Sequence, residues 1–78
     1  MIFAKRLFNG GHTREFIVDR TRDDGWEVRE AQDNHVVKRA RLHDWHRVES
    51  AMMRFGIEAM HLERNGWIEL QSPASSIV

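Results

Sequence analysis

The sequence predicts an α+β fold: a four- to five-stranded antiparallel sheet (β-β-β-β-α, possibly with a final short β) with one long helix packed across one face. Residues 2–42 hold four β-rich runs separated by Gly- and Asp/Asn-containing turns. Residues 45–64 then repeat apolar side chains every three or four positions, as an amphipathic helix does. We therefore expect one domain over 1–70 and a flexible tail over 71–78.

The first hairpin is predicted from residues 2–8 and 13–19, which flank "NGGH". Gly10-Gly11 suits a two-residue loop, because both central positions of such a loop can take positive φ. This loop length fixes the register and gives the hairpin one apolar face and an opposite-charge pair across the strands. The expected pairs are Arg6 with Glu15, Leu7 with Arg14, Lys5 with Phe16, and Phe3 with Val18.

The second hairpin is predicted from "WEVREA" and "HVVKRARL", after a turn in "RTRDDG". A three-residue loop over residues 33–35 pairs Trp26 with Leu42 and Val28 with Ala40. Both pairs then lie on the core face, which favours this register, because a one-residue slip would turn them toward solvent.

The helix is predicted over residues 45–64, a length of about 30 Å at 1.5 Å per residue. Asp44 is the expected N-cap, and Gly66 the expected residue just past the C-terminal end. "WIEL", 67–70, is a possible fifth strand. The stripe expected to face the sheet consists of Trp45, Val48, Met52, Phe55, Ala59 and Leu62.

Composition excludes several classes of protein. The 78 residues contain no cysteine, so disulfides and thiolate metal sites are absent. Twelve acidic and twelve Lys or Arg residues balance, so no overall field draws the chain to nucleic acid or to an anionic membrane. No apolar run has the length of a signal peptide core or a membrane span. We expect a cytoplasmic protein with no membrane association.

A second apolar stripe lies about 140° around the helix from the first. It consists of Met53, Ile57 and Met60, with Gly56 on its flank. A helix on a single sheet buries one face, so a second stripe requires another surface. That surface is either a partner, which would be a second copy (a homodimer) or another protein, or an internal cover made by the tail or by Ile68 and Leu70.

The basic stretch "HVVKRARLHDWHR", 35–47, has a competing interpretation. The register places Arg29, Arg39 and Arg41 on the outer sheet face, where guanidinium groups can bind phosphates. Glu27 beside Arg41 cancels part of this charge, and base-stacking aromatic residues are missing from the stretch. A solvated mixed-charge face is the simpler interpretation, and nucleic-acid binding is the alternative.

Metal binding and catalysis have little support in the sequence. His43 and His46 form a close histidine pair, but His43 precedes the N-cap and no third ligand is evident. No nucleophile motif or phosphate-binding glycine loop occurs, and the paired Asp23-Asp24 lies in a loop. We expect no metal, no cofactor and no enzymatic activity.

The end of the long helix followed by "NGW" is similar to the end of WGR domains. Their Trp-Gly-Arg triplet is absent, and "GWEVR" has different spacing, so no family and no residue role follows. The sequence as a whole predicts a small non-enzymatic protein-interaction or self-association module. Its expected partner-binding residues are Met53, Gly56, Ile57 and Met60; the alternative is a nucleic-acid-binding module using Arg29, Arg39 and Arg41.

Overall fold

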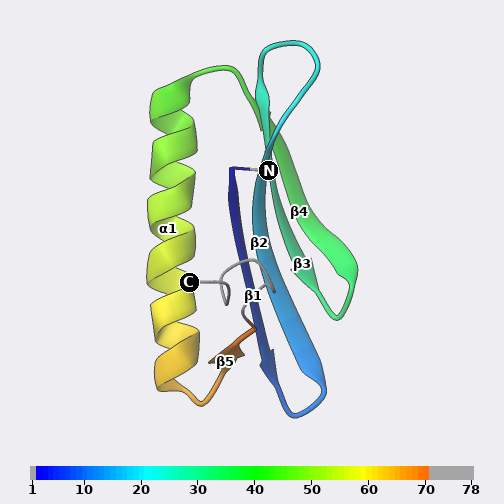
Figure 1. Ribbon diagram of the computed structural model, residues 1–78, viewed down its shortest axis with the longest axis vertical. Coiled ribbons are helices and arrows are strands. Elements are labelled where there is room, and N and C mark those ends of the chain that lie inside the picture. Colours follow the sequence, from blue (N-terminus) through cyan, green and yellow to red (C-terminus); the bar gives the residue numbers. More distant parts are fainter. Residues whose placement is uncertain (1, 71–78) are drawn as a thin grey trace, which may run out of the picture.

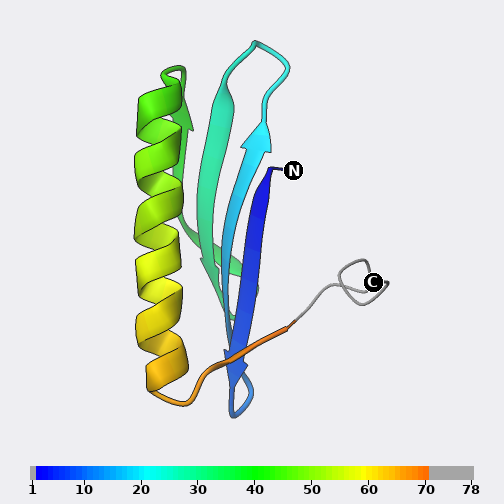
Figure 2. The same ribbon diagram turned by 60° about the vertical axis from the view of Figure 1, so that its left-hand side comes forward.

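The computed structural model describes residues 2–70 and has two layers, a five-stranded antiparallel sheet and one long helix on one of its faces (Figures 1 and 2). This confirms the predicted α+β fold. The segment 71–78, predicted to be a flexible tail, lies outside the described residues. The sheet order is β4-β3-β2-β1-β5. The elements are β1 (Phe3–Asn9), β2 (His12–Arg20), β3 (Trp26–Gln32), β4 (His35–Leu42), α1 (Trp45–Arg64) and β5 (Ile68–Glu69).

The β1–β2 hairpin has the predicted register. Gly10 and Gly11 form its tip with φ of 55° and 90°, a conformation that L side chains rarely adopt. All four predicted pairs occur, among them Arg6 opposite Glu15 and Phe3 opposite Val18. The two-residue glycine loop therefore fixes which side chains of this hairpin face the core.

The β3–β4 hairpin confirms the predicted pairs but not the predicted loop. Trp26 lies opposite Leu42 and Val28 opposite Ala40, as expected. The loop has two residues rather than three, because Asp33 and Asn34 both take positive φ, 51° and 69°. Such a turn matches the twist of the strands. The extra residue is instead taken up by an irregularity beside Glu30 and Ala31, so the expected pairs are restored further along the strands.

Helix α1 begins and ends where the sequence predicts. The Asp44 carboxylate accepts a hydrogen bond from the His46 backbone N–H at 3.0 Å, which satisfies one free donor of the first turn. At the other end Gly66 has a φ of 95°, and its N–H donates to the Glu63 carbonyl. The chain then turns back, and β5 pairs antiparallel with β1.

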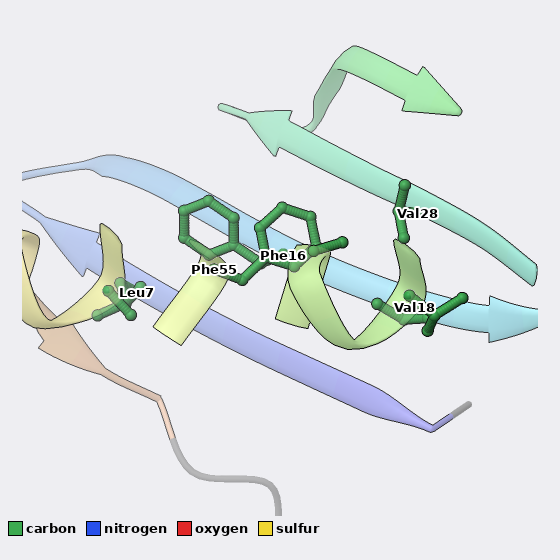
Figure 3. Close-up of a cluster of buried hydrophobic side chains, with 8 residues drawn as sticks. Leu7, Phe16, Val18, Val28 and Phe55 are labelled. Carbon is green, nitrogen blue, oxygen red and sulfur yellow. The ribbon is translucent and has the colours of Figure 1, made fainter. Parts of the chain in front are cut away.

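The core lies between α1 and the inner sheet face. Figure 3 shows Phe55 of α1 beside Phe16 of β2, and their ring centroids are 5.1 Å apart. Leu7, Val18 and Val28 contribute from three strands. The remaining buried core residues come from the helix: Val48, Ala51 and Ala59.

The buried stripe of α1 differs from the predicted stripe at two positions. Trp45 is 44% exposed, because it lies in the first turn and packs against Trp26, with ring centroids 5.3 Å apart, rather than over the sheet centre. Ala51 is fully buried although the predicted stripe omits it. Its small side chain lets the helix approach the sheet closely, and the apolar spacing alone did not reveal this.

Candidate interaction surfaces

The second helix stripe is exposed on the side of α1 that faces away from the sheet. Met53, Ile57 and Met60 are 69, 54 and 55% exposed, respectively. Gly56 lies on the flank of this stripe and is half-buried. We call the surface made by Met53, Gly56, Ile57 and Met60 the outer helix face. It brings together all four partner-binding residues expected from the sequence.

The internal cover that the sequence left open is not formed by Ile68 and Leu70. Ile68 pairs with Phe8 of β1 at the sheet edge and is itself 60% exposed. The Leu70 backbone N–H donates to the Arg6 carbonyl at 2.7 Å, which extends the same pairing. Both residues are therefore held at the β1 edge of the sheet. The other possible cover, the segment 71–78, lies outside the described residues.

Gly56 is not required by the packing of the described chain. A methyl group built at its Cα meets no atom within 4 Å, and the glycine has no positive φ. A glycine inside a helix costs about 1 kcal/mol relative to alanine. Packing within residues 2–70 therefore gives no reason for a glycine at this position.

Opposite charges flank the outer helix face, a feature that the sequence-based prediction missed. Glu49 lies one turn before Met53, and Arg64 lies one turn after Met60. The Glu49 Oε1 is 3.7 Å from the exposed His46 Nδ1. No carboxylate among residues 2–70 lies within ion-pair distance of Arg64. The helical periodicity that identified the apolar stripe places these charges on the same side, so the signal was present in the sequence.

The outer sheet face carries the three arginines of the alternative prediction, as expected. Glu27 lies among them, and its side chain is only 17% exposed. Its carboxylate oxygens are 3.5 Å from Arg29 Nε, 3.7 Å from Arg39 Nε and 4.0 Å from Arg41 Nε. One carboxylate is thus shared by three guanidinium groups.

A second carboxylate on this face further reduces its positive charge. Asp19 of β2 accepts a hydrogen bond from Arg29 Nη2. An aromatic ring also belongs to this face, because Leu7 is buried in the core and the next residue, Phe8, must point the opposite way. Phe8 lies on β1, where it pairs with Thr13, and both β2 and β3 separate it from the arginines on β4. The face therefore lacks the closely spaced combination of aromatic and basic groups that nucleic-acid platforms use.

The two histidines of the pair around Asp44 each lie next to a different carboxylate. The His43 Nε2 is 3.6 Å from Asp23 Oδ2, in the β2–β3 loop, whereas His46 lies next to Glu49 on the helix. Their side chains therefore do not converge on one point. Within residues 2–70 no group of three or more His, Cys, Asp or Glu side chains is placed to hold a metal ion.

Two turn carboxylates have an altered pKa, and each has a local structural cause. The Thr13 backbone N–H donates to Asp33 Oδ1 at 2.9 Å and His12 Nδ1 lies 3.2 Å from Oδ2, so the pKa of Asp33 is lowered. The Thr21 hydroxyl donates to Asp23, which lowers the pKa of that carboxyl. Both groups fix turns at the ends of the sheet, and both are exposed to solvent.

A groove of ≈ 410 Å³ runs along the flank of α1 beside the edge of the sheet. Its walls carry charges of both signs, including Glu30, Lys38 and Arg54, and Ile57 lies on its helix side. Arg14 Nη2 bonds Glu58 Oε1 at 3.0 Å and ties this flank of the helix to β2. The groove is open to solvent, without the enclosed apolar interior typical of small-molecule sites.

Comparison with known proteins gave no relative from which a function could be transferred. A scan for known protein families, a search of curated proteins and a search of solved structures each found no match. Among residues 2–70, no helix has an apolar stretch long enough to cross a membrane. Function must therefore be inferred from the exposed surfaces of residues 2–70.

Proposed function

We propose that this protein is a small, non-enzymatic interaction module that binds a protein partner, either a second copy or another chain, through its outer helix face. The observation that carries the proposal is the exposure of Met53, Ile57 and Met60 along one side of a helix whose other side is fully used in the core. Contiguous exposed apolar side chains of this kind mark interaction sites on soluble proteins.

The nature of these side chains also supports the proposal. Methionine is flexible and polarisable, so it adapts to the shape of an opposing surface. Ile57, at the centre, adds a branched side chain of fixed shape. Burying each of them would contribute about 1.5–3 kcal/mol before the costs of association.

Nucleic-acid binding through Arg29, Arg39 and Arg41 is the weaker candidate. The three guanidinium groups share Glu27, and Arg29 also bonds Asp19. A phosphate would have to displace these carboxylates, and neither the remaining positive charge of this face nor base stacking on aromatic rings would compensate for that displacement.

We also propose, from the sequence, that the protein is located in the cytoplasm.

Site-specific photo-crosslinking in the cells that naturally make the protein tests this proposal. A photoreactive amino acid in place of Met60 should give a discrete cross-linked product, because that side chain would contact the partner. The matched control is the same amino acid in place of Ile68, which is equally exposed but lies at the sheet edge.

The mass of the product separates the two kinds of partner. A product of twice the chain mass indicates a second copy, and any other single mass indicates a different protein. No product from position 60, or equal products from positions 60 and 68, would contradict the proposal, because the outer helix face would then not be the preferred contact.

A further inference from the structure

The outer helix face is complementary to the same face of a second copy whose helix runs in the opposite direction. A point midway between Gly56 and Ile57 is equally distant along the helix from Met53 and Met60. The same point is equally distant from Glu49 and Arg64, the charges that flank the stripe. A twofold axis through this point would therefore bring Met53 to Met60 of the second copy and Glu49 to Arg64.

We infer that the partner is a second copy of this chain, bound helix to helix in antiparallel orientation about that axis. This inference rests on the proposed function and adds the partner, orientation and register. The assembly has four layers, sheet-helix-helix-sheet, because α1 covers one face of its own sheet and no described element stands on its other side (Figures 1 and 2). An interface of this kind uses the same patch on both subunits.

Charge selects the antiparallel orientation. Antiparallel pairing forms two Glu49–Arg64 contacts per dimer, whereas parallel pairing in register opposes each charge to its own kind. Each of these residues lies about 11 Å along the helix from the axis, at 1.5 Å per residue. At the shallow crossing angle of about 20° common in helix bundles, the helices diverge there by only about 4 Å, within reach of both side chains.

Gly56 has a defined role in this arrangement. It lies beside the axis, where two helices approach each other most closely, and it opposes Ile57 of the second copy. Without a side chain at this position, Ile57 can fit against the facing helix backbone. The space beside Gly56 is empty within the described chain, and in the dimer the Ile57 side chain of the second copy fills it.

The size of the patch sets the expected strength of binding. Three partly exposed apolar side chains and two charges per subunit fall short of the ≈ 800 Å² per partner of a standard stable interface. We therefore expect a dissociation constant on the order of tens of micromolar. Sedimentation velocity of the purified full-length chain from about 5 to about 500 µM brackets this range.

Gly56→Ala separates the role of the glycine at the interface from any role in folding. Alanine meets no atom within 4 Å in the described chain and favours a helix, so the melting temperature measured at low concentration should rise. The dimer should weaken at least about tenfold, because two methyl groups at the axis push the helices apart. Dimerisation as strong as that of the unaltered chain would overturn the inference.

A charge exchange tests orientation and register. Glu49→Arg alone and Arg64→Glu alone should each weaken association about tenfold, because each places like charges at both ends of the antiparallel interface. The double variant restores both contacts and should recover association to within about threefold of the unaltered chain. Improved folding cannot cause this recovery, because the double variant still carries the unfavourable interaction of a glutamate at position 64 with the C-terminal end of the helix dipole.

The remaining outcomes also decide the inference. Failure of the double variant to recover would overturn the antiparallel register. An unaltered chain that stays monomeric over the whole concentration range would overturn self-pairing; a cross-linked product from position 60 at another mass would then leave the proposed function intact. A monomer without any such product would contradict both.

Discussion

The outer helix face and the outer sheet face both expose groups that proteins use for binding. Only on the outer sheet face do these groups already interact with side chains of the same chain. On the sheet, Arg29, Arg39 and Arg41 surround Glu27 at 3.5–4.0 Å, and Asp19 bonds Arg29 as well. On the helix, Met53, Ile57 and Met60 are more than half exposed. Most of the positive charge on the sheet is therefore offset by neighbouring carboxylates, whereas the apolar stripe on the helix has no cover among residues 2–70.

Residue type alone therefore does not identify a binding surface. Counting arginines favours the sheet, and counting apolar residues favours the helix, so composition does not decide between them. What decides is whether the neighbours already supply the interaction that each group can make. A phosphate must compete with Glu27 for the arginines, whereas an apolar partner on the helix displaces only water.

The largest expected effect comes from a charge in the outer helix face. Ile57→Asp would bury two unpaired carboxylates in each dimer, so association should weaken more than about a hundredfold, or about 3 kcal/mol. Stability of the monomer should change by no more than about 0.5 kcal/mol, because the side chain is exposed. Sedimentation and thermal melts measure the two quantities.

Ile68→Asp is the matched control, with the same exchange at similar exposure on the sheet edge. It should leave association unchanged. If both variants dissociate the dimer, or neither does, the distinction between the two faces is wrong.

The next largest effect should come from Glu27→Gln, which removes the carboxylate shared by three arginines. We expect stability to fall by about 1 kcal/mol, since Glu27 is largely buried and its partners are partly exposed. We also expect binding of single-stranded DNA that is detectable at low salt and weakens steeply as the salt concentration rises. Chemical denaturation and fluorescence anisotropy measure these effects.

The unaltered chain provides the corresponding test of the sheet face. In the same low-salt titration it should produce no shift, and the double variant Arg39→Gln with Arg41→Gln should behave identically. Stability of that variant should change by at most about 0.5 kcal/mol, because exposed ion pairs contribute little. Tight binding by the unaltered chain, lost in the double variant, would instead support the nucleic-acid alternative.

The smallest effect concerns the acid sensitivity of the sheet. The Thr13 N–H and His12 lower the pKa of Asp33, so its ionised carboxylate stabilises the fold. This contribution is present above the ordinary pKa of about 3.8 and is lost as pH falls through the lowered value. Asp33→Asn should therefore flatten the loss of melting temperature below about pH 4.

Asp24→Asn is the control for this measurement, because Asp24 also takes positive φ in a turn, at 63°. It accepts no comparable backbone hydrogen bond from another described strand. An equal flattening in both variants would show that the acid response does not depend on the contact between Asp33 and β2.

Much of the fold follows from local signals in the sequence. Gly10-Gly11 fixes the first hairpin, and Asp44 and Gly66 set the helix ends, because each position demands a conformation that few residues accept. The β3–β4 loop was mispredicted because apolar pairing fixes which residues lie opposite each other but not where an extra residue is placed. Val28 meets Ala40 with either a longer loop or an irregularity in the strand.

The candidate site was only partly predictable. Helical spacing identified Met53, Ile57 and Met60, but their exposure depends on the path of β5, which periodicity does not specify. Likewise, the register placed Glu27 near Arg41, but the sharing of its carboxylate by three arginines depends on side-chain conformations. The symmetric placement of Glu49 and Arg64 is visible in the sequence once the apolar stripe is known to be exposed.

Self-association through the outer helix face is tested most directly by NMR of the side-chain methyl groups in the presence of a soluble paramagnetic agent, over increasing protein concentration. We expect the Met53, Ile57 and Met60 methyl groups to become protected as concentration rises, whereas those of Val36 and Ile68 stay accessible. Protection confined to Val36 and Ile68, or full accessibility of the Met53 and Met60 methyl groups at every concentration, would contradict it.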